Sequence, residues 1–187
     1  MTQHRILGIS GSLRRDSTNR KLVREAARHY VPTDYTEADV RLPLYDGDVE
    51  DSDGIPAAVQ TLADQIADAD AVLISGPEYN KSISGVLKNA LDWVSRVEGN
   101  PWLDKPVAIM SAAAGRTGGE ATQFALRLAM VSFRPRLLLG PQVMIAGARS
   151  EFDETGRLKN DRYTATLIQL MAALRAEVEL TGQAANS

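Results

Sequence analysis

The sequence predicts an α/β domain in which a doubly wound, five-stranded parallel sheet carries helices on both faces. Three observations predict this class. Short apolar runs alternate along the chain with longer segments of helical periodicity, so strands and helices follow one another in turn. The run at 71–74 contains no polar residue, which is typical of a central parallel strand buried on both faces. Loops rich in small and hydroxyl-bearing residues follow the first, third and fourth predicted strands.

The first half of the chain begins with a strand predicted at 6–10. An amphipathic helix pattern follows Asn19, and Pro32 ends it. A weaker second strand is predicted at 35–40. The stretch 42–56 is rich in Pro, Asp and Gly and is predicted to be the longest irregular connection, a kind of segment that often carries function.

The second half repeats the alternation. Helical periodicity over 59–69 precedes the strand at 71–74, and a helix carrying 86–94 leads to a strand at 107–110. The closing elements are predicted as a helix at 121–131, a fifth strand at 137–145 and a helix at 162–180. We find no internal repeat and no shift in composition, so we expect a single domain over residues 1–187.

The order of these strands follows from chain handedness. Because crossovers between parallel strands are right-handed, few topologies remain for five strands, and we expect the order 2-1-3-4-5. Ligands of such sheets bind beyond the carboxyl ends of the strands, where the winding direction reverses, here between the first and third strands. The loops after the first, third and fourth strands are therefore the candidates for a functional site.

The composition excludes several function classes. A formal net charge of -3 gives no basic footprint for nucleic acid, and no apolar stretch approaches the roughly 20 residues that span a bilayer, so neither nucleic acid nor membrane is an expected partner. The absence of cysteine excludes disulfides, thiolate nucleophiles and Cys-ligated metals, and we expect no metal site. No signal-peptide segment begins the sequence, so we expect a cytoplasmic protein. With only His4 and His29 available, a Ser-His-Asp hydrolase is not expected.

The loop at 8–19 suits a phosphate group. It brings small residues, four hydroxyl groups and two arginines to the start of a helix. Amides and the dipole of a helix N-terminus favour an anion, and arginine can bind one through two hydrogen bonds. Alternatively, Ser17 or Asn19 only caps the helix while Arg14 and Arg15 point into water. The Gly-x-Gly-x-x-Gly fingerprint of nicotinamide-binding Rossmann domains is absent.

The loop at 77–82 is polar although it directly follows a fully apolar strand. Pro77 restricts the backbone, Tyr79 offers a flat surface, and Glu78 and Asn80 can form hydrogen bonds with the edge of a heteroaromatic ring. Alternatively, Asn80 forms a simple turn and Tyr79 is an ordinary surface residue.

Taken together, the motifs resemble a known family. They are Gly-Ser-Leu-Arg at 11–14 with Ser17 and Asn19, and Pro-Glu-Tyr-Asn at 77–80 followed by Leu-Lys-Asn-Ala at 87–90 and Asp-Trp at 92–93. They resemble the NADPH-dependent FMN reductases, and within that family the bacterial quinone and chromate reductases. The likeness extends along nearly the whole chain, to Leu-Pro-Leu-Tyr-Asp at 42–46 and Phe-Asp at 152–153.

The resemblance implies a flavodoxin-like fold and an enzyme that passes hydride from NADPH or NADH, through tightly bound FMN, to a small acceptor in a ping-pong cycle. The implied acceptors are quinones first, then chromate, azo or nitro compounds and free flavin. The resemblance also implies a homodimer or homotetramer, for which the helix carrying Leu87, Leu91 and Trp93 is a candidate surface. One alternative is a flavodoxin-type electron carrier without nicotinamide turnover, and another is a phosphate-binding module without redox chemistry.

The resemblance further implies the residues that hold FMN. The phosphate would lie against Ser10, Gly11, Ser12, Arg14, Ser17, Thr18 and Asn19. The isoalloxazine ring and ribityl chain would lie against Pro77, Glu78, Tyr79 and Asn80. The pyrimidine edge would pass Ser111, Ala113 and Gly115. The helix residues assigned to packing and loop support are Lys88, Asn89, Asp92 and Trp93. No side chain is assigned as a nucleophile, general acid or general base.

Overall fold

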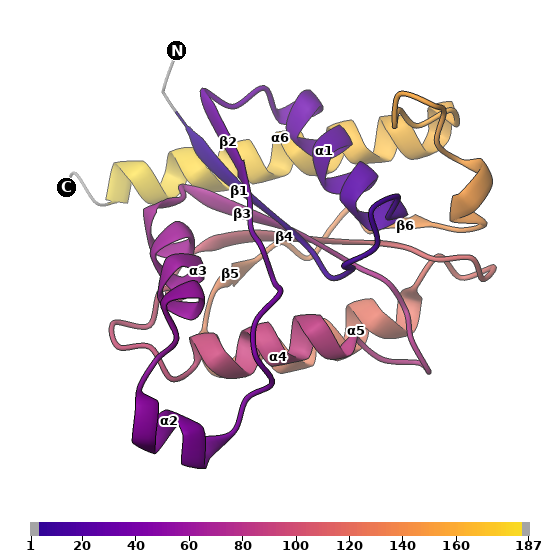
Figure 1. Ribbon diagram of the computed structural model, residues 1–187. Coiled ribbons are helices and arrows are strands. Elements are labelled where there is room, and N and C mark those ends of the chain that lie inside the picture. Colours follow the sequence, from indigo (N-terminus) through magenta and orange to yellow (C-terminus); the bar gives the residue numbers. More distant parts are fainter. Residues whose placement is uncertain (1–3, 185–187) are drawn as a thin grey trace.

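A parallel sheet lies between two layers of helices in the computed structural model, which describes residues 4–184 (Figure 1). The strands are β1 (Arg5–Ser10), β2 (Asp34–Glu37), β3 (Ala71–Gly76), β4 (Pro106–Ala112), β5 (Arg136–Leu137) and β6 (Val143–Ile145). Their order is β2-β1-β3-β4-β5, with β6 also pairing with β4, and every pairing is parallel. The predicted fold class and strand order are confirmed.

The helices are divided between the two faces of the sheet, as Figure 1 shows. One face is covered by α1 (Thr18–Tyr30) and α6 (Asp161–Ala184). The other is covered by α3 (Ala57–Asp68), α4 (Gly85–Val94) and α5 (Glu120–Met130). Short 3-10 turns follow α5 at Val131–Phe133 and β6 at Ala148–Ser150.

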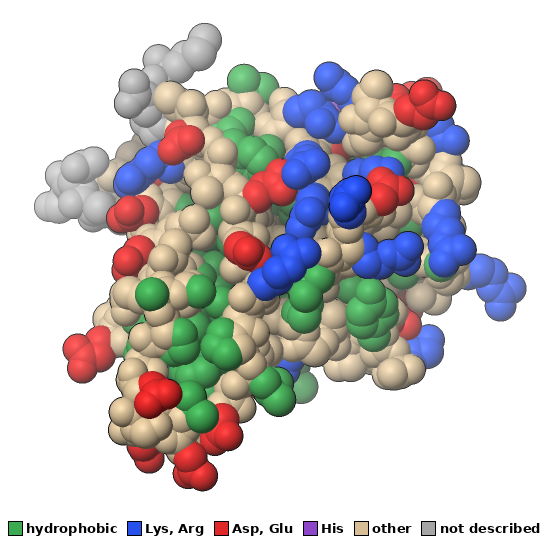
Figure 2. Space-filling view, in the orientation of Figure 1, with side chains coloured by type: hydrophobic (Ala, Val, Ile, Leu, Met, Phe, Trp, Pro, Cys, Tyr) green, Lys and Arg blue, Asp and Glu red, His purple; other side chains and the backbone are tan. Residues whose placement is uncertain are grey.

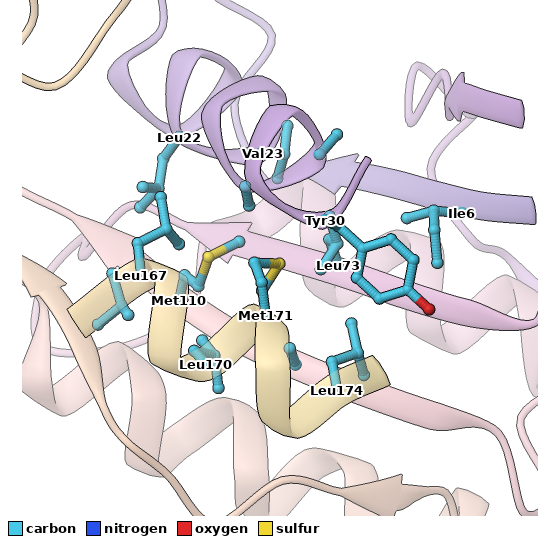
Figure 3. Packing of buried hydrophobic residues seen from close by; sticks show 14 of the residues in the cluster. Ile6, Leu22, Val23, Tyr30, Leu73, Met110, Leu167, Leu170, Met171 and Leu174 are labelled. Carbon is cyan, nitrogen blue, oxygen red and sulfur yellow. The ribbon is translucent and has the colours of Figure 1, made fainter. Parts of the chain in front are cut away.

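Two apolar cores result, because successive side chains of a strand point to opposite faces. Figure 3 shows the core under α1 and α6, where Met110 of β4 lies among Leu22 of α1 and Leu167 and Met171 of α6, and Tyr30 at the end of α1 lies beside Leu73 of β3. None of these six side chains is more than 2% exposed. This packing holds α1 against the sheet and so fixes where the helix begins, beside the carboxyl end of β1.

The predicted irregular stretch at 42–56 contains a helix, α2 (Gly47–Asp53), so that part of the prediction is wrong. The Asp46 side chain caps it by accepting a hydrogen bond from the Asp48 amide at 3.0 Å, and Glu50 forms an ion pair at 2.9 Å with Arg96, which follows the end of α4. No residue of α2 is buried. The helix therefore has no apolar periodicity by which the sequence would reveal it.

The predicted fifth strand at 137–145 is divided into β5 and β6. β5 pairs with the start of β4 through Leu137 and Val107, whereas β6 pairs with the end of β4 through Met144 and Ser111. Pro141 lies between the two pieces, and since proline has no amide hydrogen it cannot donate to the ladder. The edge of the sheet is interrupted at this residue.

Charged side chains are distributed unevenly over the surface (Figure 2). Lys and Arg gather over the start of α1, whereas Asp and Glu gather over α2. Within the described residues, no helix combines the length and the apolar character needed to cross a bilayer.

Candidate functional site

A cleft of about 430 Å³ opens where the loops after β1, β3, β4 and β6 meet, at the carboxyl edge of the sheet. This is the place that the winding rule predicts for a ligand. The residues that line it are Ser12, Arg14, Asp16, Ser17, Thr18, Asn19, Lys21, Pro77, Glu78, Tyr79, Ala112, Ala113, Ala114, Ala148, Arg149 and Phe152.

The first loop presents the N-terminus of α1 to the cleft. Ser17 is the N-cap, and its hydroxyl oxygen accepts a hydrogen bond from the Arg20 amide at 3.3 Å. The amides of Thr18 and Asn19 have no acceptor among the described residues, as is usual at the start of a helix. The Arg14 side chain is exposed and forms no ion pair with a described residue. Two free amides and a guanidinium group therefore line one end of the cleft.

An acidic residue also lies at this end. The Asp16 carboxylate forms an ion pair with Lys21 Nζ at 2.5 Å. The hydrogen bond from Lys21, together with its positive charge, lowers the pKa of Asp16 below its usual range. Lys21 therefore offsets the negative charge that Asp16 brings to the cleft.

Asn19 fixes the first loop to the two central strands. Its Oδ1 accepts hydrogen bonds from Ser75 Oγ at 2.8 Å and from the Ala112 amide at 3.0 Å, and its Nδ2 donates to the Ala112 carbonyl at 2.9 Å. All three bonds are buried. We call this group the Asn19 clamp; it joins the start of α1 to the ends of β3 and β4.

The second loop, after β3, is held by a two-residue turn. Tyr79 and Ser82 exchange two backbone hydrogen bonds of 3.1 Å, while Asn80 and Lys81 have positive φ angles of 51° and 64°. Positive φ at both central residues is the pattern of a type I′ turn, which Asn adopts readily. Asn80 therefore forms the turn that was given as the alternative to a binding role, and Tyr79 stands half-exposed beside the cleft.

Two further contacts connect this loop to its neighbours. Glu78 Oε2 accepts a hydrogen bond from the Ala121 amide at 3.0 Å, which caps the start of α5. Ser84, the N-cap of α4, donates from its hydroxyl to the Gly11 carbonyl at 2.6 Å. The loop after β3 and its neighbours are thus tied together by Glu78, which caps α5, and by Ser84, which begins α4.

The loop after β4 turns part of its polar groups away from the cleft. The Ser111 hydroxyl is buried, donates to the Gly118 carbonyl at 2.7 Å and accepts from Gln123 Nε2 at 3.0 Å. The Ala113 amide donates to the Ile145 carbonyl at 3.0 Å. The amides of Ala114 and Gly115 have no acceptor among the described residues.

Nine of the fourteen residues predicted to bind FMN line the cleft: Ser12, Arg14, Ser17, Thr18, Asn19, Pro77, Glu78, Tyr79 and Ala113. The other five do not line it: Ser10, Gly11, Asn80, Ser111 and Gly115. Ser10 is buried with its hydroxyl unpaired, at the end of β1. The binding roles of all fourteen stay predictions.

Two of the four α4 residues assigned to packing and loop support, Asn89 and Trp93, have that role. Asn89 Nδ2 and Trp93 Nε1 both donate to the Pro43 carbonyl, at 2.9 and 2.8 Å, and Lys88 pairs with Asp92 at 2.7 Å. Asn89 and Trp93 therefore hold the connection between β2 and α2, whereas Lys88 and Asp92 only pair with each other along α4.

The sequence reasoning missed the segment after β6. Ala148, Arg149 and Phe152 line the cleft, as does Lys21 one turn into α1. Position on the helix could have revealed Lys21, since it lies four residues after the N-cap. No pattern near Arg149 marked it, because the predicted fifth strand did not show where its loop would lie.

Comparison with known proteins decides which family this site belongs to. The family model of NADPH-dependent FMN reductases matches residues 4–150. The chain belongs to the NADPH-dependent FMN reductase family. The predicted family and the prediction that the chain is an enzyme of this class are therefore confirmed.

Individual members of the NADPH-dependent FMN reductase family are similar over most of their length. The chain is 43% identical over 173 residues to an NAD(P)H-dependent FMN reductase of Pseudomonas aeruginosa, covering 91% of this chain and 93% of the relative. It is 36% identical over 157 residues to a quinone reductase of Escherichia coli, covering 82% and 84% respectively. Among solved structures, FerB of Paracoccus denitrificans, a flavoenzyme NAD(P)H:(acceptor) oxidoreductase, matches with a TM-score of 0.84 and 28% identity over 94% of this chain and 97% of FerB.

Proposed function

We propose that this chain is an FMN-dependent NAD(P)H oxidoreductase that passes hydride from NADPH or NADH to a small acceptor in a ping-pong cycle. The observation that carries the proposal is the chemical division of the cleft. Helix amides and the cations Arg14 and Lys21 line one end, and the ring of Tyr79 stands beside an apolar wall that includes Pro77 and Ala113.

The residues present fit FMN. Its phosphate needs hydrogen-bond donors and positive charge, which the amides of Thr18 and Asn19 and the Arg14 guanidinium provide. Its flat ring needs apolar contact, and a volume of about 430 Å³ lies within the range of cofactor sites. Bound FMN would supply the hydride chemistry that amino-acid side chains lack.

The role of the protein would then be to hold FMN in position and to donate hydrogen bonds to it. The Asn19 clamp and the Ser84 cap hold the first two loops in fixed relation. The unpaired amides of Ala114 and Gly115 are the donors left in the third loop for the pyrimidine edge of the flavin. Charge that develops there on reduction would be stabilised by such donors. We assign no side chain as a nucleophile, general acid or general base.

Quinones are the acceptors that we propose first, since several similar proteins are named quinone reductases. Chromate, azo compounds, nitro compounds and free flavin are further candidates, because a half-exposed ring at the cleft leaves room for varied acceptors. We also propose a cytoplasmic location, which cell fractionation would test.

The visible spectrum of the purified protein tests the proposal. FMN is added to the protein, and the spectrum is recorded before and after NADPH or NADH is added without oxygen. A benzoquinone is then added, and the spectrum is recorded again. Bleaching by the nicotinamide and recovery with quinone are expected. Bound FMN that neither nicotinamide bleaches would instead favour an electron carrier, and absence of flavin binding would refute both functions. Tyr79→Ala should slow turnover or weaken FMN binding without unfolding the domain.

We propose in addition that the chain forms homodimers or homotetramers through α5. The helix surface first considered is not available, because Leu87, Leu91 and Trp93 are buried in the core. By contrast, Phe124 and Leu128 of α5 are 58% and 76% exposed, on one side of the helix. Exposed apolar rows of this kind mark association surfaces. Sedimentation should show an oligomer that Leu128→Glu dissociates; an unchanged oligomer would exclude this face.

A further inference from the structure

The segment between β6 and α6 is fastened on both sides of the cleft. The Ala148 amide donates to the Ala113 carbonyl at 3.0 Å, which ties the segment to the loop after β4. Farther along, the Gly156 carbonyl accepts a hydrogen bond from Arg28 Nη2 at 2.9 Å, and Gly156 is close enough to Lys21 that an added Cβ would lie 3.5 Å from Lys21 Cγ. Arg149 lies between these attachments, directly after Ala148, and it lines the same cleft as Ser17, Thr18 and Lys21 at the start of α1.

Arg149 differs from most cations of this surface in having no acidic partner among residues 4–184. Figure 2 shows the Lys and Arg side chains that gather over the start of α1. Arg24 binds Glu37, Arg28 binds Glu25 and Lys21 binds Asp16. Among the cations that line the cleft, Arg14 and Arg149 alone have no ion pair with a described residue.

We infer that Arg149 is a second guanidinium group for the flavin phosphate, acting from the wall opposite Arg14. This inference rests on the proposed function. A phosphate monoester carries close to two negative charges at neutral pH, which is more than one arginine and a helix N-terminus neutralise, and the charge of the nearby Lys21 is already paired with Asp16. The planar fork of a guanidinium group matches two phosphate oxygens. Such a contact also provides a means of selecting FMN over riboflavin, which has the same ring but no phosphate.

The test compares the affinities of the apoprotein for FMN and riboflavin, measured by quenching of flavin fluorescence. Arg149→Ala should weaken FMN binding about tenfold or more, because a charge-assisted hydrogen bond is lost, and should leave riboflavin binding unchanged. Arg149→Lys should restore part of the FMN affinity. Arg15→Ala is the matched control, since Arg15 is exposed in the first loop but does not line the cleft, and it should change neither affinity.

A second measurement separates a binding role from a structural one. The Arg149 side chain has no hydrogen bond or ion pair with a described residue, so the melting temperature of the Arg149→Ala apoprotein should equal that of the wild type. Unchanged FMN affinity, an equal loss for both flavins, or a lowered melting temperature would each overturn the inference while leaving the proposed function intact. Failure of the wild type to bind either flavin would overturn the proposed function itself.

Discussion

Replacing Asn19 with alanine tests whether the Asn19 clamp holds the two central strands and α1 together. The substitution removes three buried hydrogen bonds and leaves the Ser75 hydroxyl and both backbone groups of Ala112 without partners. Each buried polar group left unpaired costs about 1–3 kcal/mol. Partial relaxation of the cavity brings the expected loss to about 3–5 kcal/mol, a large part of the roughly 5–15 kcal/mol by which domains are stable.

Urea unfolding followed by tryptophan fluorescence measures this loss, since both Trp93 and Trp102 are buried. Asn89→Ala is the matched control: Asn89 also makes backbone hydrogen bonds, to Tyr45 and Pro43, but at the outer connection. Asn89→Ala should lower the free energy of unfolding by less than Asn19→Ala does, about 1–2 kcal/mol.

A double-mutant cycle makes the test sharper. Ser75→Ala alone should cost about 1 kcal/mol, since one hydrogen bond is lost. In the Asn19→Ala background the same change removes a hydroxyl that is already unpaired, so it should cost nothing or stabilise. Losses that simply add, or a loss below about 1 kcal/mol for Asn19→Ala, would refute the role of the clamp.

Three further substitutions have expected outcomes. Gly118→Ala should lower the free energy of unfolding by about 2–4 kcal/mol, because φ of Gly118 is +63° and the new Cβ would lie 2.7 Å from the Met144 carbonyl carbon. Gly115→Ala is the control, because its new Cβ would have no described atom within 4 Å. Equal urea midpoints for the two variants would contradict this account. Burial raises the pKa of Tyr30 to about 12, so the folded state keeps a proton that the unfolded state loses near pH 10, and stability should fall as pH rises from about 10 to 12. Melting temperatures of Tyr30→Phe should fall less steeply over that range, and a fall as steep as in the wild type would exclude this residue as the cause. Ser84→Ala should lower the free energy of unfolding by about 1–3 kcal/mol, because the hydrogen bond to the Gly11 carbonyl and the N-cap of α4 are both lost. Ser84→Thr should recover most of this stability. An alanine variant as stable as the wild type in calorimetry would argue against a stabilising hydrogen bond from Ser84 to Gly11.

The sequence was sufficient for the order of the strands and for three of the four loops that form the cleft, because these depend on local patterns. A fully apolar run such as 71–74 predicts a strand buried on both faces, and the strand order follows from handedness. The position of Ser17 before an amphipathic segment predicts the helix start that faces the cleft.

What the sequence did not reveal depends on contacts between distant segments. α2 is held by its cap and by the ion pair of Glu50 with Arg96, neither of which leaves a periodic pattern. The inward turn of Ser111 follows from Gln123, twelve residues later, which shares its hydroxyl. Arg149 reaches the cleft only because the edge strand is divided and its loop returns to α1.

The divided edge strand also bears on how copies of the chain can meet. A long, unbroken edge offers a row of unpaired amides and carbonyls on which the strand of another molecule can be templated, the usual route to amyloid-like aggregation. In the described part of the chain, the sheet ends on one side with four residues of β2 and on the other with β5 and β6, of two and three residues, separated by Pro141. Both margins are short, so the described sheet offers few unpaired amides and carbonyls on which a foreign strand could be templated.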